Sequence, residues 1–260
     1  MPQLPNNLNK YMGFVIAIAG KGGTGKTTVA ALLVRIIKEK KLGSILAVDA
    51  DPNSNLAENL GLTVKENVGS IIDDIVLHPE KIPAGMSKDR FMEYRIQLSI
   101  QEGEGFDLLT MGRPEGPGCY CYANNVLRNI TAKLIEDYDY VVIDNEAGLE
   151  HLSRRTTRAC DTLLVISDAT AVGMRSAQRI DELAKEMGIK IKKRLLIINQ
   201  NDKEVDKQFF KDSGLEYIGN IPKDDNIIKI SQNGGTFWEL DKDSVSLKAL
   251  VELGDKIWQK

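Results

Sequence analysis

Cysteine is scarce in this sequence. Three residues among 260 are too few and too unevenly spread to form a disulfide framework, so any chemistry of these thiols is metal binding or redox chemistry. The sequence also lacks an uninterrupted apolar run near the ~20 residues that span a bilayer, and its N-terminus has none of the regions of a secretory signal. We therefore expect a cytoplasmic protein without a membrane partner.

An excess of positive charge is missing as well, because the formal net charge is -3. No global positive field is available to hold nucleic acid, although Arg154, Arg155 and Arg158 form one small basic cluster. Internal repeats, low-complexity tracts and Gly/Ser linkers are absent too. We expect no nucleic-acid partner, and one domain over residues 13–260 that follows a loose N-terminal extension, residues 1–12.

Short aliphatic and β-branched runs alternate with helical stretches along the chain. The runs predict buried parallel strands at Phe14 to Ala19, Ser44 to Asp49, Asp107 to Met111, Tyr140 to Asp144, Thr162 to Ser167 and Arg194 to Asn199. The helical stretches include Lys26 to Lys40, Asn124 to Glu136 and Ser176 to Met187. This alternation predicts an α/β fold with a doubly wound, mostly parallel sheet and helices on both faces. The charge-rich stretch Glu66 to Gly105 predicts a helical excursion outside the sheet.

A glycine-rich loop follows the first expected strand and precedes a helical pattern. Its sequence, with these flanks, is typical of a P-loop that binds nucleotide phosphates. The glycines let backbone N–H groups turn toward phosphate oxygens, Lys26 reaches the β and γ phosphates, and Thr27 offers its hydroxyl to Mg²⁺. The residues expected to contact ATP or ADP are Gly20, Lys21, Gly22, Gly23, Thr24, Gly25, Lys26, Thr27 and Thr28.

Lys21 is a second lysine in the loop, just after its first glycine, where an ordinary Walker A motif has no fixed requirement. Here the sequence resembles the deviant Walker A family, which includes nitrogenase iron protein, the MinD and ParA partitioning ATPases and the arsenite-pump ATPases. The resemblance implies that Lys21 crosses a dimer interface to contact the nucleotide of the partner subunit. Catalysis would then require a homodimer.

Two further motifs of the sequence match the switches of that family. Asp49 and Asp51 follow the second strand, whose carboxyl end is where open α/β sheets bind ligands. By resemblance, Asp51 orients or deprotonates the attacking water and Asp49 helps to hold the magnesium shell, while Asp144 is the Walker B acid. Gly148 ends the second switch and senses the γ phosphate, although Glu146 departs from the small residue or proline common there in relatives. Lys21, Lys26 and Asp51 are therefore the expected catalytic residues.

Two of these positions have alternative interpretations. Asp51 could instead cap the helix expected at Asn53 to Leu60, a role that does not explain Asp49. Asn199 ends the strand Arg194 to Ile198, and in relatives an asparagine at this point reads the adenine edge with its amide. Asparagine also terminates strands for turn reasons alone.

Cys119 and Cys121 lie between the two switches, in a Gly-Pro-Gly-Cys-Tyr-Cys-Tyr segment. Residues two apart in an extended segment face the same way, so both sulfurs can reach one metal ion. A symmetric dimer would bring four thiolates together, which is the number that a tetrahedral site such as that of Zn²⁺ uses. Iron–sulfur ligation and two unrelated structural cysteines are the alternatives.

Lys21, the Asp-Ala-Asp-Pro switch, the Cys-Tyr-Cys segment and the run Ala147 to Leu152 together resemble the CooC and AcsF group of this ATPase family. That group is implicated in inserting nickel into carbon monoxide dehydrogenase and acetyl-CoA synthase. The resemblance implies a nickel-enzyme client and Ni²⁺ as the metal of Cys119 and Cys121. Our hypothesis for the mechanism is that ATP closes two subunits across facing P-loops and that hydrolysis relaxes the dimer.

Three other functions of the same family compete with this one. A MinD-like positioning ATPase would end in a basic amphipathic helix, whereas Ser244 to Lys260 nearly balances its charges and places Val245, Ala249, Leu250, Leu253 and Ile257 on one face, as in a helix packed on the core. A ParA-like DNA segregation ATPase conflicts with the acidic charge balance. An iron–sulfur carrier or reductase would require a cluster that absorbs visible light.

Overall fold

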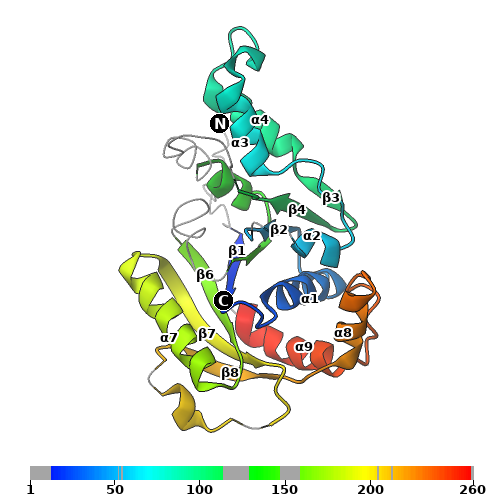
Figure 1. The fold of residues 1–260 in the computed structure, drawn as a ribbon, viewed down its shortest axis with the longest axis vertical. Coiled ribbons are helices and arrows are strands. Elements are labelled where there is room, and N and C mark those ends of the chain that lie inside the picture. The colour runs from blue at the N-terminus through cyan, green and yellow to red at the C-terminus, as the bar shows by residue number, and fades with distance from the viewer. Residues whose placement is uncertain are drawn as a thin grey trace, which may run out of the picture.

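The computed structural model describes residues 13–51, 53, 55–113, 129–146, 159–203, 205–211 and 213–258. One sheet of eight strands forms its centre, in the order β3-β4-β2-β5-β1-β6-β7-β8 (Figure 1). The strands are β1 (Phe14–Gly20), β2 (Ile45–Asp49), β3 (Gln101–Gly103), β4 (Phe106–Thr110), β5 (Tyr140–Asp144), β6 (Ala159–Ser167), β7 (Lys190–Asn199) and β8 (Glu216–Ile221). All neighbouring strands are parallel except β3 and β4.

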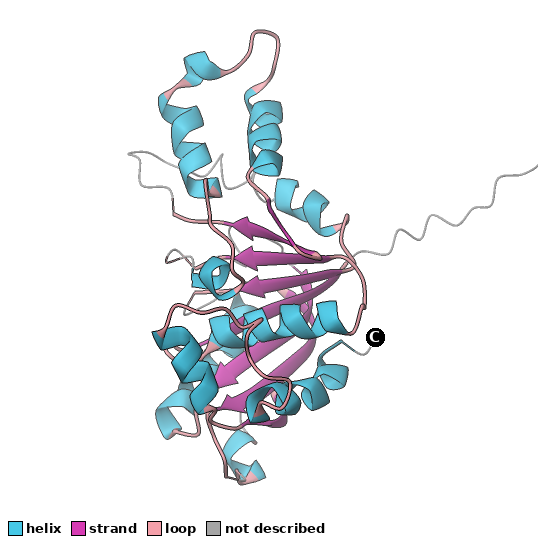
Figure 2. Cartoon of the chain, turned by 90° about the vertical axis from the view of Figure 1, so that its right-hand side faces the viewer, coloured by secondary structure: helices cyan, strands magenta, loops and turns pink. Residues whose placement is uncertain are grey.

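Helices cover both faces of this sheet (Figure 1), and Figure 2 shows one of these faces toward the viewer. They are α1 (Lys26–Glu39), α2 (Asn55–Asn59), α3 (Val68–Leu77), α4 (Lys88–Leu98), α7 (Ala171–Glu186), α8 (Asp225–Gln232) and α9 (Val245–Trp258), with short 3₁₀ turns η1 (Pro79–Lys81) and η2 (Lys207–Phe210). Residues 129–135 are also helical. The predicted α/β fold with a mostly parallel, doubly wound sheet is therefore confirmed.

The central strand β1 shows why the sheet needs two helical layers. All seven of its residues are buried, because alternate side chains point to opposite faces and both faces are covered. Val15, Ala17 and Ala19 belong to the core cluster on the α7 side of the sheet, whereas Phe14, Ile16 and Ile18 belong to the cluster on the α1 side. The sequence of a strand that is buried on both faces is a continuous apolar run, which is why this strand could be predicted.

Two strands are missing from the sequence prediction. The edge strand β3 is three residues long and forms only because Gly105, at φ 81, turns the chain back onto β4. The other edge strand, β8, mixes polar and apolar residues and contains Gly219. In addition, β7 begins at Lys190 rather than Arg194, because its polar amino end continues the parallel pairing with β6. The prediction therefore included the buried central strands of the sheet and missed its two edge strands and the amino end of β7.

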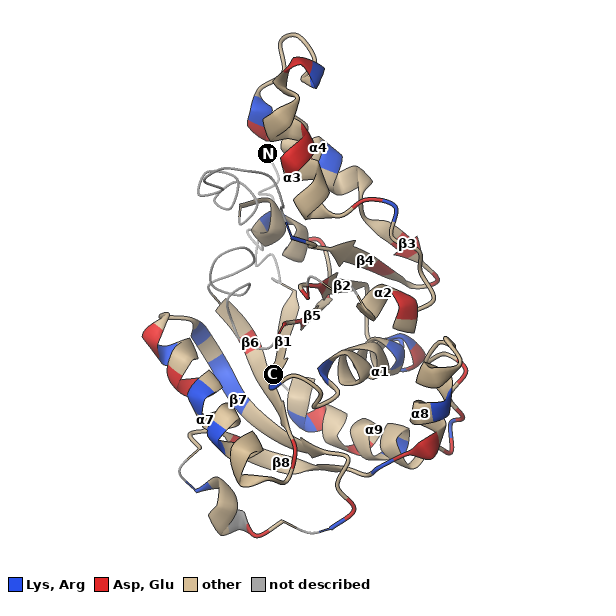
Figure 3. Cartoon of the chain, in the orientation of Figure 1, with Lys and Arg blue, Asp and Glu red and all other residues tan. Residues whose placement is uncertain are grey.

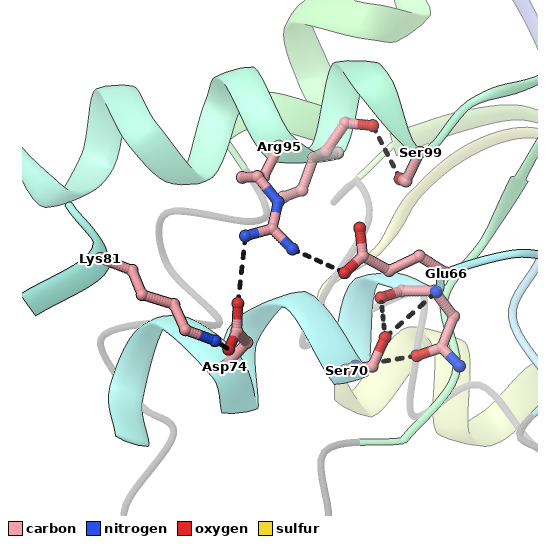
Figure 4. A network of polar contacts seen from close by, with 8 residues as sticks. Glu66, Ser70, Asp74, Lys81, Arg95 and Ser99 are labelled. Carbon is pink, nitrogen blue, oxygen red and sulfur yellow. Dashed lines mark hydrogen bonds and ion pairs between the residues drawn. The ribbon is translucent and has the colours of Figure 1, made fainter. Parts of the chain in front are cut away.

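The stretch predicted as a helical excursion contains the two helices α3 and α4, which extend beyond the sheet in Figure 1. Arg95 of α4 donates to Asp74 of α3 (3.1 Å) and to Glu66 (2.6 Å), and Lys81 donates to the other oxygen of Asp74 (2.6 Å; Figure 4). These ion pairs hold the pKa of Asp74 below its usual range. The network joins the two helices, whose buried apolar side chains belong to the same core cluster.

The last helix, α9, packs on the core as predicted, with a different set of buried side chains. Leu247, Leu250, Leu253 and Ile257 are buried, whereas Val245 is 52% exposed. The helix begins at Val245, so this residue lies at the end of the helix and outside its buried face. No helix in the described part of the chain is both long enough and apolar enough to cross a membrane.

The Arg35 side chain links α1 to the segment before α9 by hydrogen bonds. Removing this side chain should destabilise the protein. The side chain is 3% exposed and donates to the carbonyls of Phe237 (2.7 Å) and Leu240 (2.6 Å) and to Glu39 (2.9 Å). Arg35→Ala leaves two buried carbonyls without their donor, and we expect the free energy of unfolding to fall by about 2–4 kcal/mol. Urea unfolding of the nucleotide-free protein measures this change.

The control for this prediction is Arg179→Ala. Arg179 also forms ion pairs, to Glu182 and Glu186, but it is 60% exposed, and exposed pairs contribute little to stability. Equal losses of stability in the two variants would contradict the role given to Arg35.

Candidate nucleotide-binding site

The glycine-rich loop leaves the carboxyl end of β1 and turns into α1 without side-chain obstruction. Gly20 (φ 158) has no room for a side chain, since a Cβ would lie 2.3 Å from the Ile166 carbonyl oxygen. Gly23 (φ 81) and Gly25 (φ 86) adopt left-handed conformations that favour glycine. The loop therefore needs glycine at these positions to curve around a ligand.

The first turn of α1 has no side-chain cap. Its N-cap residue is Gly25, whereas Asn67 caps α3, Ser87 caps α4 and Thr170 caps α7 through side-chain oxygens. The free N–H groups and the positive end of the helix dipole at α1 therefore point toward the loop. An uncapped helix start below a glycine loop is suited to an anion such as a nucleotide phosphate.

The two lysines of the loop lie in different environments. Lys26 is 7% exposed, and its ammonium donates to the Lys21 carbonyl at 3.3 Å. Lys21 is exposed, as are Gly22 and Gly23. Lys26 is thus placed to act within its own subunit, and the Lys21 side chain lies at the surface.

Asp49 and Asp144 lie side by side at the carboxyl edge of the sheet, because β2 and β5 pair with these residues in register. Asp49 is fully buried and Asp144 is 1% exposed. Burial raises the pKa of Asp49 to about 7, and the neighbouring charge of Asp144 adds to the effect. Burial also raises the pKa of Asp144 to about 6, against the lowering effects of the Thr27 hydroxyl and the Lys26 ammonium. A bound cation would stabilise the charged forms of these two neighbouring buried carboxylates.

The two carboxylates differ in their hydrogen bonds. Asp49 accepts from the N–H groups of Asp51 (3.2 Å) and Leu56 (2.9 Å). Neither oxygen of Asp144 has a hydrogen-bond partner of normal geometry among the described residues. The unpaired oxygens of Asp144, next to Thr27, fit a hard cation such as Mg²⁺, which prefers oxygen ligands. When bound, such an ion would neutralise phosphate charge at this edge.

Asp49 has the structural role that the sequence offered as an alternative for Asp51. The Leu56 N–H at the start of α2 donates to Asp49, whereas Asp51 accepts from the backbone and side-chain nitrogens of Asn53. The capping alternative proposed for Asp51 is therefore wrong, since the turn at Asn53 precedes the helix. Asp51 is half-buried beside the loop.

Asn199 contacts the phosphate loop directly. Its amide nitrogen donates to the Thr24 carbonyl at 2.8 Å, and a Cβ on Gly25 would lie 2.4 Å from that nitrogen. Asn199 lines two hollows, one shared with Gly23 and Thr24, the other lying between α1 and the end of β8. The second hollow was missed by the sequence prediction, and its lining includes Thr28, Ile221, Pro222 and Asp224.

Several predicted residues lie outside the described part of the chain. They are Cys119, Cys121 and Gly148, together with the basic cluster Arg154, Arg155 and Arg158. Among the residues that are described, no group of three or more His, Cys, Asp or Glu side chains could hold a metal ion. The third cysteine, Cys160, is buried, and burial raises the pKa of its thiol to about 12, so it is suited to packing rather than metal binding.

Comparison with known proteins assigns this site to a family. The model of the CobQ/CobB/MinD/ParA nucleotide binding domain matches residues 15–237. The chain belongs to this family. It is an ATP-binding P-loop ATPase of the MinD/ParA type, and the matched residues include both the glycine loop and the acids of β2 and β5.

Individual members of the MinD/ParA family match nearly the whole chain. An uncharacterized ATP-binding protein of Methanocaldococcus jannaschii is 43% identical over 95% of this chain and 99% of its own. The carbon monoxide dehydrogenase accessory protein CooC of Rhodospirillum rubrum is 28% identical over 91% and 96% of the two chains. The septum site-determining protein MinD of Pyrococcus horikoshii, solved with Mg-ADP, has a TM-score of 0.69 at 20% identity and covers 95% of this chain and 97% of its own.

A concentration of basic residues on β7 is visible in Figure 3, next to the charged helix α7. Lys192 pairs with Asp161 (2.6 Å), Arg194 pairs with Asp181 (3.1 Å), and Lys193 donates to the Lys256 carbonyl (3.4 Å). Lys192 and Arg194 are therefore paired with carboxylates of β6 and α7, and Lys193 bonds a carbonyl of α9. The basic strand of this ATPase thus contacts three neighbouring elements through these side chains.

Proposed function

We propose that this ATPase is a nucleotide-dependent dimeric maturation factor that assists nickel insertion into carbon monoxide dehydrogenase or acetyl-CoA synthase. The observation that carries the proposal is the full-length similarity to the Rhodospirillum CooC protein, joined to a Cys-Tyr-Cys segment between the two switches. Nickel is the cargo in this scheme. ATP binding closes two subunits, and hydrolysis opens them.

The site residues have separate roles in this proposal. Lys26 and the loop N–H groups bind the β and γ phosphates, Thr27 and Asp144 hold Mg²⁺ with Asp49 behind them, and Asp51 orients the attacking water. Gly148 senses the γ phosphate. The base would lie in the hollow beside Asn199, between α1 and the end of β8. Lys21, which is exposed, reaches the nucleotide of the partner subunit.

The metal site of this proposal is formed by Cys119 and Cys121 of two subunits. A change of dimer geometry with nucleotide state would alter the distance between the two cysteine pairs, and so control the release of metal. Thiolates also suit Zn²⁺ and Cu(I), so the proposed site selects its metal through availability and geometry. A bound metal would in turn stabilise the dimer.

Anaerobic titration with Ni²⁺ and Zn²⁺ tests the metal site. We expect about one metal ion per dimer, because four thiolates complete a tetrahedral set only when two chains meet. Native mass spectrometry with metal analysis, with and without ADP or ATP, measures mass and metal content together.

The matched control is a Cys119→Ser, Cys121→Ser double variant, with Cys160→Ser as a second control because that thiol is buried away from solvent. The double variant should lose the metal and the metal-dependent dimer, and Cys160→Ser should retain both. Metal binding that survives the double variant would contradict the proposal and leave an ATPase with another client.

A MinD-like positioning role is the other candidate of the same family. Such a role requires an amphipathic segment that is free to bind a membrane surface. In this structure the apolar face of α9, including Leu250 and Ile257, is buried against α1 and β8. This packing favours the maturation factor over the positioning ATPase.

A further inference from the structure

The carbonyl oxygen of Lys21 accepts three donors from its own loop. They are the Thr24 hydroxyl (2.9 Å), the Lys26 ammonium (3.3 Å) and the Thr24 N–H (3.4 Å). These bonds close a turn from Lys21 to Thr24 that contains two exposed glycines, Gly22 and Gly23. The Lys21 side chain is exposed, so we infer that its direction depends on the backbone from which it starts. The three hydrogen bonds to the carbonyl hold that backbone in place.

Thr24 is itself held firmly from two strands. It is 6% exposed, and its own carbonyl accepts from Asn199 at the end of β7. Its hydroxyl fits against Gly20 at the end of β1, where a Cβ would lie 2.9 Å from the oxygen. The anchor of the Lys21 turn is therefore part of the sheet edge rather than of the exposed loop tip.

The three donors differ in what happens when phosphate binds. The Lys26 ammonium is the group that phosphate would attract, so its bond to the Lys21 carbonyl is the one that ligand replaces. The Thr24 hydroxyl has no charge, and the Thr24 carbonyl is held separately by Asn199. The hydroxyl is the side-chain donor that can hold Lys21 in both nucleotide states.

We propose that Thr24 is a positioning residue for Lys21, which its hydroxyl holds in the orientation that presents the lysine ammonium to the partner subunit. This inference rests on the proposed action of Lys21 across the dimer. A turn that is already ordered loses less conformational freedom when two subunits close. The Thr24 hydroxyl therefore acts on dimer closure and turnover, whereas the nucleotide contact expected of Thr24 uses its backbone, which a side-chain substitution keeps.

The experiment compares Thr24→Val with Thr24→Ser in the full chain. Valine keeps the branched shape and removes the hydroxyl, whereas serine keeps the hydroxyl. We expect Thr24→Val to lower both kcat and the AMPPNP-dependent dimer affinity roughly five- to tenfold, and Thr24→Ser, which keeps the hydroxyl, to lower both by clearly less. Sedimentation measures dimerisation, and a fluorescent ADP analogue measures nucleotide affinity, which should change less than about threefold in both variants.

Experiments in a Lys21→Ala background distinguish the positioning role of Thr24 from the action of Lys21 across the dimer. If Thr24 acts through Lys21, adding Thr24→Val to Lys21→Ala causes no further loss of dimer affinity. Suppose that Lys21→Ala is inactive. The positioning role alone is then overturned if Thr24→Val has wild-type kcat and dimer affinity, or if it loses as much ADP affinity as turnover. Full turnover in Lys21→Ala overturns the trans action of Lys21 and the positioning role with it.

Discussion

Lys21→Ala is expected to lower kcat for ATP hydrolysis at least about a hundredfold, while ATP affinity changes by less than about threefold. The physical reason is that the Lys21 side chain is exposed in its own subunit, whereas Lys26 is buried beneath the loop and remains to bind phosphate. A cation supplied by a partner stabilises charge that develops on the phosphoryl group in the transition state. Steady-state phosphate release and equilibrium nucleotide binding measure the two quantities.

Complementation between two inactive chains shows whether the lysine acts across the interface. A mixture of Lys21→Ala and Asp51→Asn chains should regain about a quarter of wild-type activity, since roughly half of the dimers are mixed and each contains one complete site. Lys65→Ala, at another exposed lysine, is the matched control and should behave as the wild type. Unchanged turnover in Lys21→Ala would reject the trans mechanism.

Asp144→Asn is expected to change activity and stability in opposite directions. Turnover should fall at least about a hundredfold, because the amide lacks the charge that holds Mg²⁺. Stability should rise, because the cost of burying the carboxylate exceeds the favourable effects of the Thr27 hydroxyl and the Lys26 ammonium and raises its pKa to about 6. The amide also relieves the effect of this charge on the pKa of Asp49.

The stability gain of Asp144→Asn depends on pH in a definite direction. A carboxyl group with a raised pKa stabilises the folded state while it is protonated, and this contribution is lost as pH rises from about 4 to about 6. The variant should therefore match the wild type below about pH 4 and exceed it by roughly 2–3 kcal/mol above about pH 6, in the absence of nucleotide.

Urea unfolding at several pH values tests this pattern. Glu216→Gln, at an exposed carboxylate on β8, is the control and should show neither effect. A variant that is less stable than the wild type at pH 8 would mean that the charge of Asp144 has a partner in the folded protein. That result would remove the argument for a cation at this position.

Local sequence patterns were enough to predict the centre of the fold. The strand β1 and the helix α1 are apolar along their buried length, and the glycine loop between them has a linear motif, so no knowledge of distant residues is needed. The edges are different. Gln101–Gly103 forms a strand only because a glycine turn brings it to β4, and Val245 is exposed because the helix begins there.

The site could be predicted as a set of residues but not as a set of contacts. The bond between Asn199 and Thr24 joins positions 175 residues apart, and no spacing rule connects them. Similarly, the bond from Asp49 to Leu56 depends on where α2 starts, which placed the structural role on Asp49 instead of Asp51. Asn199 therefore contacts the phosphate loop in the structure, whereas the resemblance had indicated only adenine recognition.

The central place of β1 in the sheet affects how a ligand would distribute its stabilising effect. Asp49 and Asp144 come from β2 and β5 on one side of β1, whereas Asn199 and the hollow near Pro222 come from β7 and β8 on the other. A nucleotide that contacted the acids of β2 and β5 and also Asn199 would link the two halves of the sheet. Local opening of either half would then require release of the ligand, so the halves would become a single cooperative unit.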